Sequence, residues 1–138
     1  MDNAPFASSP ATLVDKPIAT VLVVDDTPEN LTLMGSLLRE HYLVKVANHG
    51  EKALKIAQSA TPPDLILLDI MMPEMDGFET MREIRKIPAL KNLPIIAVTA
   101  KAMKGDREKC IEAGAWDYLS KPVDSEQMLA VLRAWMPR

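Results

Sequence analysis

The sequence predicts an α/β fold in which a doubly wound, five-stranded parallel sheet is covered by helices on both faces. Strand-type and helix-type segments alternate five times along the chain, with short turns between them. The strand-type segments are continuous apolar runs, which is typical of strands buried on both faces of a parallel sheet. Neighbouring parallel strands need a crossover connection, and the intervening helices supply it.

The strand with the clearest signal is the apolar run from Leu65 that ends at Asp69. Pro62 and Pro63 bound it upstream, and Pro73 stops any further strand pairing. Four other segments have a similar apolar or β-branched character. The five expected strands cover residues 19–24, 43–47, 65–69, 94–99 and 115–119.

Helix signals fill the spaces between these strands. Thr27 is a plausible N-cap for the first helix, with Pro28 and Glu29 suited to its first turn, and the helix should end near His41. Gly114 should close a weaker helix over about residues 104–113 in a left-handed conformation. The residues expected to face inward are Leu31, Met34, Leu37 and Leu38, then Ala53, Leu54, Ile56 and Ala57, then Phe78, Met81, Ile84 and Ile87 before the Pro88 break, and finally Met128, Leu129, Leu132 and Trp135 after a start at Asp124 or Ser125.

Length and composition indicate one ordinary globular domain. The 138 residues are 48% hydrophobic and 25% charged, with a net charge of -3 and no dense basic stretch, so direct nucleic-acid binding is not expected. No apolar run approaches the roughly 20 residues of a membrane helix. Residues 1–17 hold three prolines without periodicity and lack the features of a secretory signal, so we expect a flexible leader, a domain over residues 18–138, and a cytoplasmic protein.

Four single residues have no strong functional signal. Cys110 has no partner for an internal disulfide and is expected to be a buried or half-buried thiol. His41 and His49 lie on peripheral segments and should be solvated. Trp116 is either a packing residue or an exposed anchor for a partner, because aromatic residues are enriched at binding hot spots.

Reactive side chains follow several of the expected strands. In a parallel sheet all carboxyl ends lie at one edge, so Asp25, Asp26, Asp69, Thr99 and Lys121 should become neighbours. Three acids would repel each other without a hard cation, and oxygen-only ligation suits Mg²⁺, whereas no His and Cys cluster offers zinc a site. Any one of these residues alone would most often be a cap or a surface ion pair, but together they indicate phosphoryl chemistry.

Four segments carry a resemblance to a known family. They are Val24-Asp25-Asp26, residues 69–77 (DIMMPEMDG), Val98-Thr99-Ala100 and residues 117–122 (DYLSKP). In order and separation they resemble the receiver domain of bacterial two-component response regulators, of the chemotaxis-regulator type, over about residues 19–136. The resemblance implies a flavodoxin-like sheet with strand order 2-1-3-4-5.

The resemblance also implies roles for the residues at the sheet edge. Asp69 would be the nucleophile that accepts a phosphoryl group from a histidine kinase or phosphotransfer protein. Mg²⁺ would be bound by the side chains of Asp26 and Asp69, by the backbone carbonyl of Met71, and by Asp25 mainly through water.

Phosphoryl oxygens would be held by a second group of residues. The family pattern assigns this to Lys121 and Thr99, helped by the backbone N–H groups of Met71 and Ala100. Pro122 implies a cis peptide bond that aims the lysine. Met71 and Lys101 flank the path of the water that hydrolyses the phosphoryl bond.

Signalling in the family is attributed to a switch. Phosphorylated Asp69 would draw Thr99 inward, and Tyr118 would rotate into the vacated space, although Tyr118 also reads as an ordinary half-buried strand tyrosine. This would change the surface formed by the fourth helix, fifth strand and fifth helix, through which a downstream protein or a second copy of the chain would bind.

Other functional classes are weaker. A small Mg²⁺-dependent phosphatase with an aspartyl nucleophile would need an acid two residues later, where this chain has Met71. A phosphorylation-independent binding module would be expected to lose acids or the lysine, and all are present. We expect no conventional enzyme but a domain that catalyses its own phosphorylation and dephosphorylation, either as a stand-alone regulator or as a receiver cut from a hybrid kinase or multidomain regulator.

Overall fold

The computed structural model describes residues 18–72, 75–100 and 106–136. Its strands are β2 (Thr20–Val24), β3 (Leu43–Ala47), β4 (Leu65–Asp69), β5 (Ile95–Thr99) and β6 (Asp117–Ser120). Its helices are α2 (Pro28–Leu38), α3 (Gly50–Ala57), α4 (Gly77–Arg85), α5 (Asp106–Ala113) and α6 (Ser125–Trp135), with a short 3-10 helix at Pro88–Leu90. The leader expected over residues 1–17 lies outside the described residues.

The five strands form one parallel sheet in the order β3-β2-β4-β5-β6. Because β2 is the first strand among the described residues, this is the order 2-1-3-4-5, and the doubly wound fold expected from the sequence is confirmed. Strands β2, β4 and β5 are the three inner strands, and nearly all their residues are buried. Their carboxyl ends carry Asp25, Asp69 and Thr99, so these side chains share one edge of the sheet.

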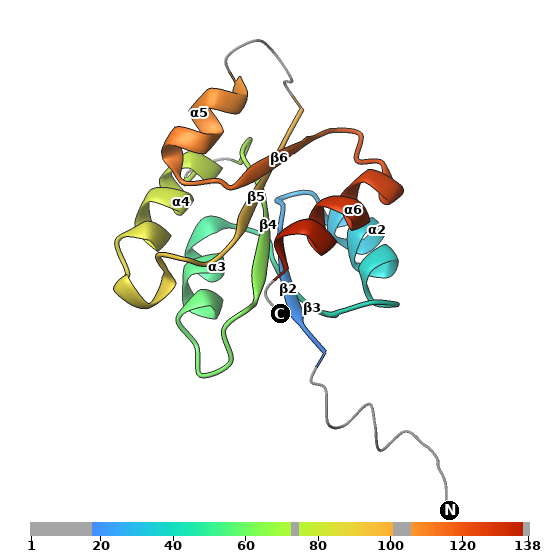
Figure 1. Cartoon of the computed structure of the whole chain (residues 1–138), viewed down its shortest axis with the longest axis horizontal. Coiled ribbons are helices and arrows are strands. Elements are labelled where there is room, and N and C mark those ends of the chain that lie inside the picture. Colours follow the sequence, from blue (N-terminus) through green and yellow to red (C-terminus); the bar gives the residue numbers. More distant parts are fainter. Residues whose placement is uncertain (1–17, 73–74, 101–105, 137–138) are drawn as a thin grey trace, which may run out of the picture.

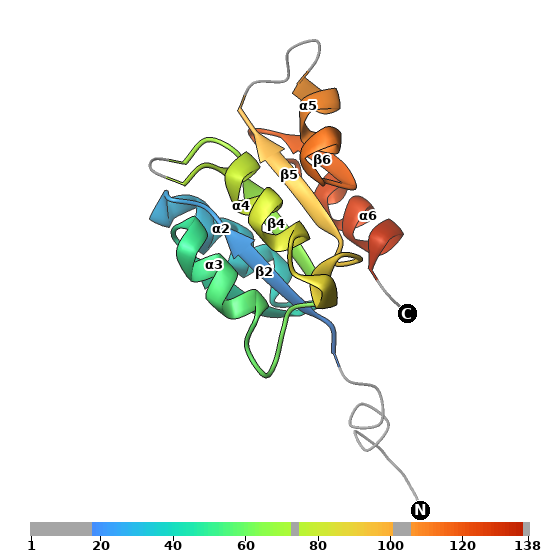
Figure 2. The same ribbon diagram turned by 90° about the vertical axis from the view of Figure 1, so that its left-hand side faces the viewer.

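Helices cover both faces of the sheet. Figures 1 and 2 show α2 and α6 on one face and α3, α4 and α5 on the other. The first core lies under α2 and α6, where Met34, Leu38, Met128 and Leu132 pack on the sheet. The second core lies under the other three helices and holds Met81, Ile84 and the buried thiol of Cys110, among others. Burial of apolar side chains on both faces is the main force that holds the sheet between its helices.

Several element ends differ from the expected ones. Helix α2 ends at Leu38 rather than near His41, because Arg39 is the C-cap and the N–H groups of His41 and Tyr42 both bond back to the carbonyl of Leu38. Strand β6 begins at Asp117 rather than Ala115, whose N–H still bonds to the carbonyl of Cys110 at the end of α5. Gly114 has the expected positive φ, at 124°.

Two capping residues also differ from expectation. Thr27 occupies the N-cap position of α2, but its side chain makes no capping hydrogen bond. His49, expected only to be solvated, is an exposed N-cap of α3 whose Nδ1 accepts a hydrogen bond from the N–H of Lys52.

Trp135 is not an inward residue of α6. Its side chain is 38% exposed and packs edge-to-face on Trp116, which is 37% exposed, with ring centroids 5.7 Å apart. The Trp135 indole Nε1–H donates to Oδ2 of Asp117 at 3.0 Å. Trp116 is therefore both partly exposed and packed, as one half of an aromatic pair at the end of α6.

Among the described residues, no helix is both long enough and apolar enough to span a membrane.

Candidate functional site

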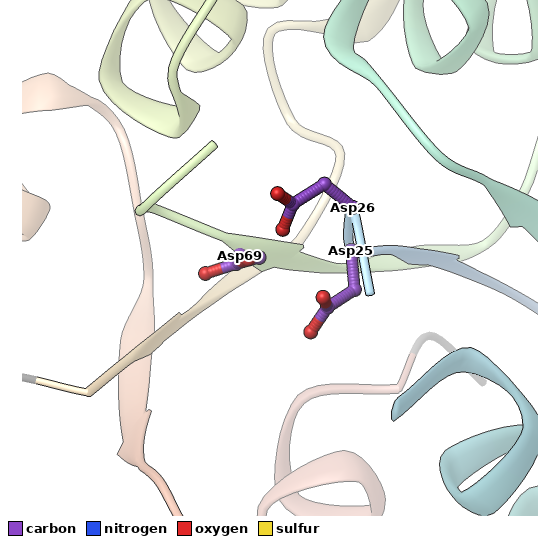
Figure 3. A group of neighbouring side chains, drawn as sticks. All are labelled: Asp25, Asp26 and Asp69. Atoms are coloured by element: carbon purple, nitrogen blue, oxygen red, sulfur yellow. The ribbon is translucent and has the colours of Figure 1, made fainter. Parts of the chain in front are cut away.

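Three carboxylates converge at the carboxyl ends of β2 and β4. Asp25, Asp26 and Asp69 each offer one oxygen, and these oxygens lie within 4.8 Å of one another. Figure 3 shows the three side chains pointing toward a common space. Asp25 and Asp69 are buried, whereas Asp26 is exposed at the mouth of the site. The sheet therefore brings together the three acids that the sequence placed at its edge.

Asp69 presents one oxygen that has no partner. Its side chain is 1% exposed, and its Oδ1 accepts a hydrogen bond from the N–H of Met71 at 3.0 Å. Its Oδ2 is buried without a hydrogen-bond partner within the described part of the chain. A buried, unpaired carboxylate oxygen is costly unless a ligand completes it. Burial raises the pKa of Asp69 to about 6, with a further increase from Asp25, while the Met71 N–H and Lys121 act in the opposite direction.

Asp25 is held from several sides. Its Oδ1 accepts from the N–H of Thr27 at 2.9 Å, and its Oδ2 accepts from Asn30 Nδ2 at 3.2 Å. The carboxylate of Asp25, rather than the Thr27 hydroxyl, thus satisfies a backbone donor where α2 begins. Asn30 was not among the residues expected at the site. It lies in the first turn of α2, five residues after Asp25, and this position is the signal that could have identified it.

Lys121 supplies the positive charge of the site from the loop between β6 and α6. Its Nζ lies 3.1 Å from Oδ2 of Asp25 and 3.4 Å from Oδ1 of Asp69. Burial alone would lower the pKa of Lys121, but the hydrogen bonds and charges of Asp25 and Asp69 outweigh it and raise the pKa. The lysine is therefore a cation. The peptide bond between Lys121 and Pro122 is cis, as the resemblance implied.

The remaining expected site residues lie at or near the same edge. Thr99 is 3% exposed at the end of β5, and the exposed Ala100 follows it. Tyr118 lies on β6 opposite Ala97 of β5 and packs, partly buried, on the core under α3, α4 and α5. Met71 follows β4 and is 50% exposed. Lys101 and Pro73 lie outside the described residues.

Gly77 allows the chain to pass close to the end of β4, where Asp69 lies. Its N–H bonds to the carbonyl of Ile70 at 3.1 Å. A Cβ at Gly77 would lie 2.5 Å from the backbone oxygen of Asp69 and 2.6 Å from the Cα of Ile70, closer than atoms can approach. A glycine is therefore required where α4 begins beside Asp69. The sequence marked this residue only as a turn.

The residues at this edge fit a magnesium ion. Their ligands are carboxylate oxygens, which Mg²⁺ prefers. The unpartnered Oδ2 of Asp69 is the kind of orphaned buried atom that a bound cation or a phosphoryl group would satisfy. Asp26, exposed at the mouth, leaves room for the waters that Mg²⁺ retains.

The fold and the site together define a class of protein: a doubly wound domain with an acidic cluster and a lysine at the carboxyl edge of its sheet. The family model described as the response regulator receiver domain matches residues 21–133. The chain belongs to this family.

Two solved structures and one curated protein show how similar the relatives are. The receiver domain of a sensor histidine kinase from Pseudomonas aeruginosa PAO1, solved with a magnesium ion coordinated in its active-site cleft, is 38% identical, with a TM-score of 0.78 over 85% of this chain and 96% of that one. The receiver domain of Ssk1, solved with the histidine phosphotransfer protein Ypd1 from Saccharomyces cerevisiae, is 29% identical, with a TM-score of 0.80 over 87% and 90% of the two chains.

The curated relative is a much longer protein. The signal transduction histidine-protein kinase BarA of Escherichia coli is 42% identical over 129 residues, which is 93% of this chain but 14% of BarA. The chain therefore corresponds to a small part of that kinase, and the similarity concerns the receiver domain alone.

Proposed function

We propose that this domain accepts a phosphoryl group on Asp69 in a Mg²⁺-dependent phosphorelay. The observation that carries the proposal is the state of the Asp69 carboxylate. Its Oδ1 is held by the Met71 N–H and Lys121, while its Oδ2 is buried and unpartnered beside two further acids. The free oxygen is available as a nucleophile, and the bound oxygen fixes its direction.

In the transfer, Oδ2 of Asp69 attacks the phosphorus of a phosphohistidine on the donor. The new bond is an oxygen–phosphorus bond, the bond that breaks is the donor's nitrogen–phosphorus bond, and the departing imidazole takes up a proton from solvent. In hydrolysis, water attacks the phosphorus, phosphate leaves, and Asp69 is regenerated. The raised pKa of Asp69 means that the apo carboxylate is partly protonated near pH 6, so the ionised nucleophile predominates above that pH.

Lys121 lies where its positive charge can stabilise the transferred phosphoryl group. Lys121 lies within 3.4 Å of Oδ1 of Asp69 while it is also paired with Asp25. On phosphorylation it would exchange part of these contacts for a phosphoryl oxygen. Thr99 and the backbone N–H groups of Met71 and Ala100 would bind the others. A metal held by Asp26, Asp69 and the Met71 carbonyl, with Asp25 acting through water, would neutralise the developing charge.

Membership of the receiver-domain family supports a particular kind of phosphoryl donor. The complex of Ypd1 with the Ssk1 receiver domain is an example in which a phosphotransfer protein and a receiver domain bind each other. We propose that a histidine kinase or phosphotransfer protein donates to this domain in the cytoplasm. A receiver within a longer hybrid kinase is the favoured setting, because BarA is such a longer relative.

The output surface is formed by α5, β6 and α6. Tyr118 lies on β6, next to the strand that ends in Thr99, and is only partly buried, so it has room to change its rotamer. Inward movement of Thr99 toward a phosphorylated Asp69 would bias Tyr118 toward its inward position and change this surface for a protein target or a second copy of the chain.

The test is phosphorylation of the purified chain. With Mg²⁺ and acetyl phosphate, intact mass spectrometry should show one added phosphoryl group, which Asp69→Asn abolishes. Asp64→Asn is the matched control, because the Asp64 carboxylate accepts a hydrogen bond from the N–H of Thr20 at the opposite end of the sheet. An adduct that survives in Asp69→Asn would refute the assignment.

A further inference from the structure

Met71 combines exposure with direct contact to the phosphoacceptor. Its side chain is 50% exposed, and its backbone N–H donates to Oδ1 of Asp69 at 3.0 Å. The other methionines that the structure describes are buried or partly buried, with Met34, Met72, Met81 and Met128 all at 7% exposure or less. Within the described residues, Met71 is therefore the thioether most open to solvent.

Covalent geometry keeps the Met71 sulfur close to the site. Three bonds beyond Cα separate the sulfur from the backbone, so it lies no more than about 5 Å from its own nitrogen. That nitrogen is 3.0 Å from Oδ1 of Asp69. The sulfur is therefore confined to within about 8 Å of the carboxylate in every rotamer.

We propose that Met71 is a reversible oxidation site that controls the lifetime of the phosphoryl group on Asp69. The inference rests on the proposed function, because it concerns the phosphorylated site. In the modification, a peroxide transfers one oxygen to the thioether sulfur, which is oxidised to a sulfoxide by two electrons. The peroxide's oxygen–oxygen bond breaks, and hydrogen peroxide is reduced to water.

Oxidation changes what the side chain does beside the phosphoryl group. The thioether is apolar and only a weak acceptor, so it does not order water beside Asp69. The sulfoxide is polar, and its oxygen accepts hydrogen bonds from water. Water held by the sulfoxide near the site favours attack on the phosphorus, so oxidation should shorten the phosphoryl lifetime. Sulfoxide reductases reverse the change.

The experiment compares oxidation and hydrolysis in the same samples. The chain is treated with dilute hydrogen peroxide, and peptide mass spectrometry follows each of its nine methionines. We expect Met71 to be oxidised at least about tenfold faster than the buried Met81 and Met128. The treated and untreated proteins are then phosphorylated with acetyl phosphate and Mg²⁺, and the half-life of the adduct is measured after the donor is removed.

The half-life should fall by at least about twofold, which corresponds to about 0.4 kcal/mol in the barrier. Met71→Leu is the matched control, because it keeps the other eight methionines and has no sulfur at this position. Whatever the half-life of the phosphoryl adduct in this variant, peroxide treatment should leave that half-life unchanged. Methionine sulfoxide reductase should restore the wild-type value, and Met71→Gln, a polar side chain of similar length, should turn over faster than Met71→Leu without oxidant.

The possible failures are distinguishable. If no adduct forms on the untreated chain, the proposed function is wrong and this inference falls with it. If the adduct forms but Met71 reacts no faster than Met81, or the half-life is the same before and after oxidation, the inference alone is refuted. If peroxide shortened the half-life of the adduct equally in Met71→Leu, the effect would belong to another methionine, and the inference about Met71 would also be refuted.

Discussion

Lys121 Nζ lies 3.1 Å from Oδ2 of Asp25, closer than to Oδ1 of Asp69 at 3.4 Å. In the unphosphorylated domain the lysine thus pairs with two buried acids at once, and Asp25 is its nearer partner. This arrangement keeps the cation beside Asp69 without covering the Oδ2 on which the phosphoryl group would form.

Replacing the lysine should destabilise the apo domain. Lys121→Met leaves Asp25 and Asp69 without their cation. Since Lys121 is 22% exposed, we expect a loss of about 1–2 kcal/mol in the free energy of unfolding, less than for a fully buried pair. Urea denaturation at pH 7 measures it. In the Asp25→Asn variant, Lys121→Met should lower the free energy of unfolding by less than it does in the wild type. Strictly additive effects of the two substitutions would argue against the pairing of Lys121 with Asp25.

Removing the charge of Asp69 should stabilise the apo domain in a pH-dependent way. The folded-state pKa of Asp69 is raised from 3.8 to about 6, so its stabilising contribution is present below pH 4 and is lost as the pH rises through about 6. Asp69→Asn should therefore match the wild type near pH 4 and exceed it by about 1–3 kcal/mol at pH 8 without Mg²⁺. Thermal or urea unfolding across this range would detect it, and a constant difference would contradict the raised pKa.

Magnesium binding should require ionised Asp69. Because protons compete with the cation for this carboxylate, the affinity for Mg²⁺ should fall as the pH drops below about 6. Isothermal titration calorimetry at several pH values measures this. Asp26→Asn should weaken binding by about tenfold or more, whereas Asp64→Asn, outside the acidic cluster, should leave the affinity unchanged.

Gly77→Ala tests the close approach of α4 to Asp69 and Ile70. A Cβ at this position meets backbone atoms of Asp69 and Ile70 at 2.5 and 2.6 Å, so the backbone must move. We expect a loss of about 1–3 kcal/mol in stability and slower phosphorylation. Gly35→Ala is the control, since a Cβ there meets only the Arg39 side chain at 3.5 Å or more. It should be neutral or stabilising by up to about 1 kcal/mol.

The aromatic pair at the end of α6 predicts a spectroscopic signal. Trp135→Phe removes the edge-to-face contact with Trp116 and the hydrogen bond from Nε1 to Asp117. It should lower the free energy of unfolding by about 0.5–1.5 kcal/mol and abolish the exciton feature of the two indoles in the far-ultraviolet circular dichroism spectrum. A comparable loss of that feature in Trp116→Phe is expected, whereas its persistence in either variant would refute the pairing.

Much of this molecule follows from local sequence patterns. Continuous apolar runs such as the one ending in Asp69 indicate buried strands, and their alternation with helices requires a parallel sheet. A parallel sheet in turn brings Asp25, Asp69, Thr99 and Lys121 to one edge whatever the details of packing. The set of residues at the candidate site was therefore predictable.

Contacts between distant segments were not predictable in this way. The periodicity of α6 reports which positions alternate between core and solvent, but it cannot tell whether the last turn reaches past the sheet. Trp135 does, and it finds Trp116 and Asp117 there instead of the core. The same holds for three details of the site: the pairing of Lys121 with two acids, the hydrogen bond from Asn30, and the unpartnered oxygen of Asp69. Each depends on differences of a few tenths of an ångström in the distances between side chains. Such distances are set by the packing of whole elements against one another, so only the tertiary structure decides them.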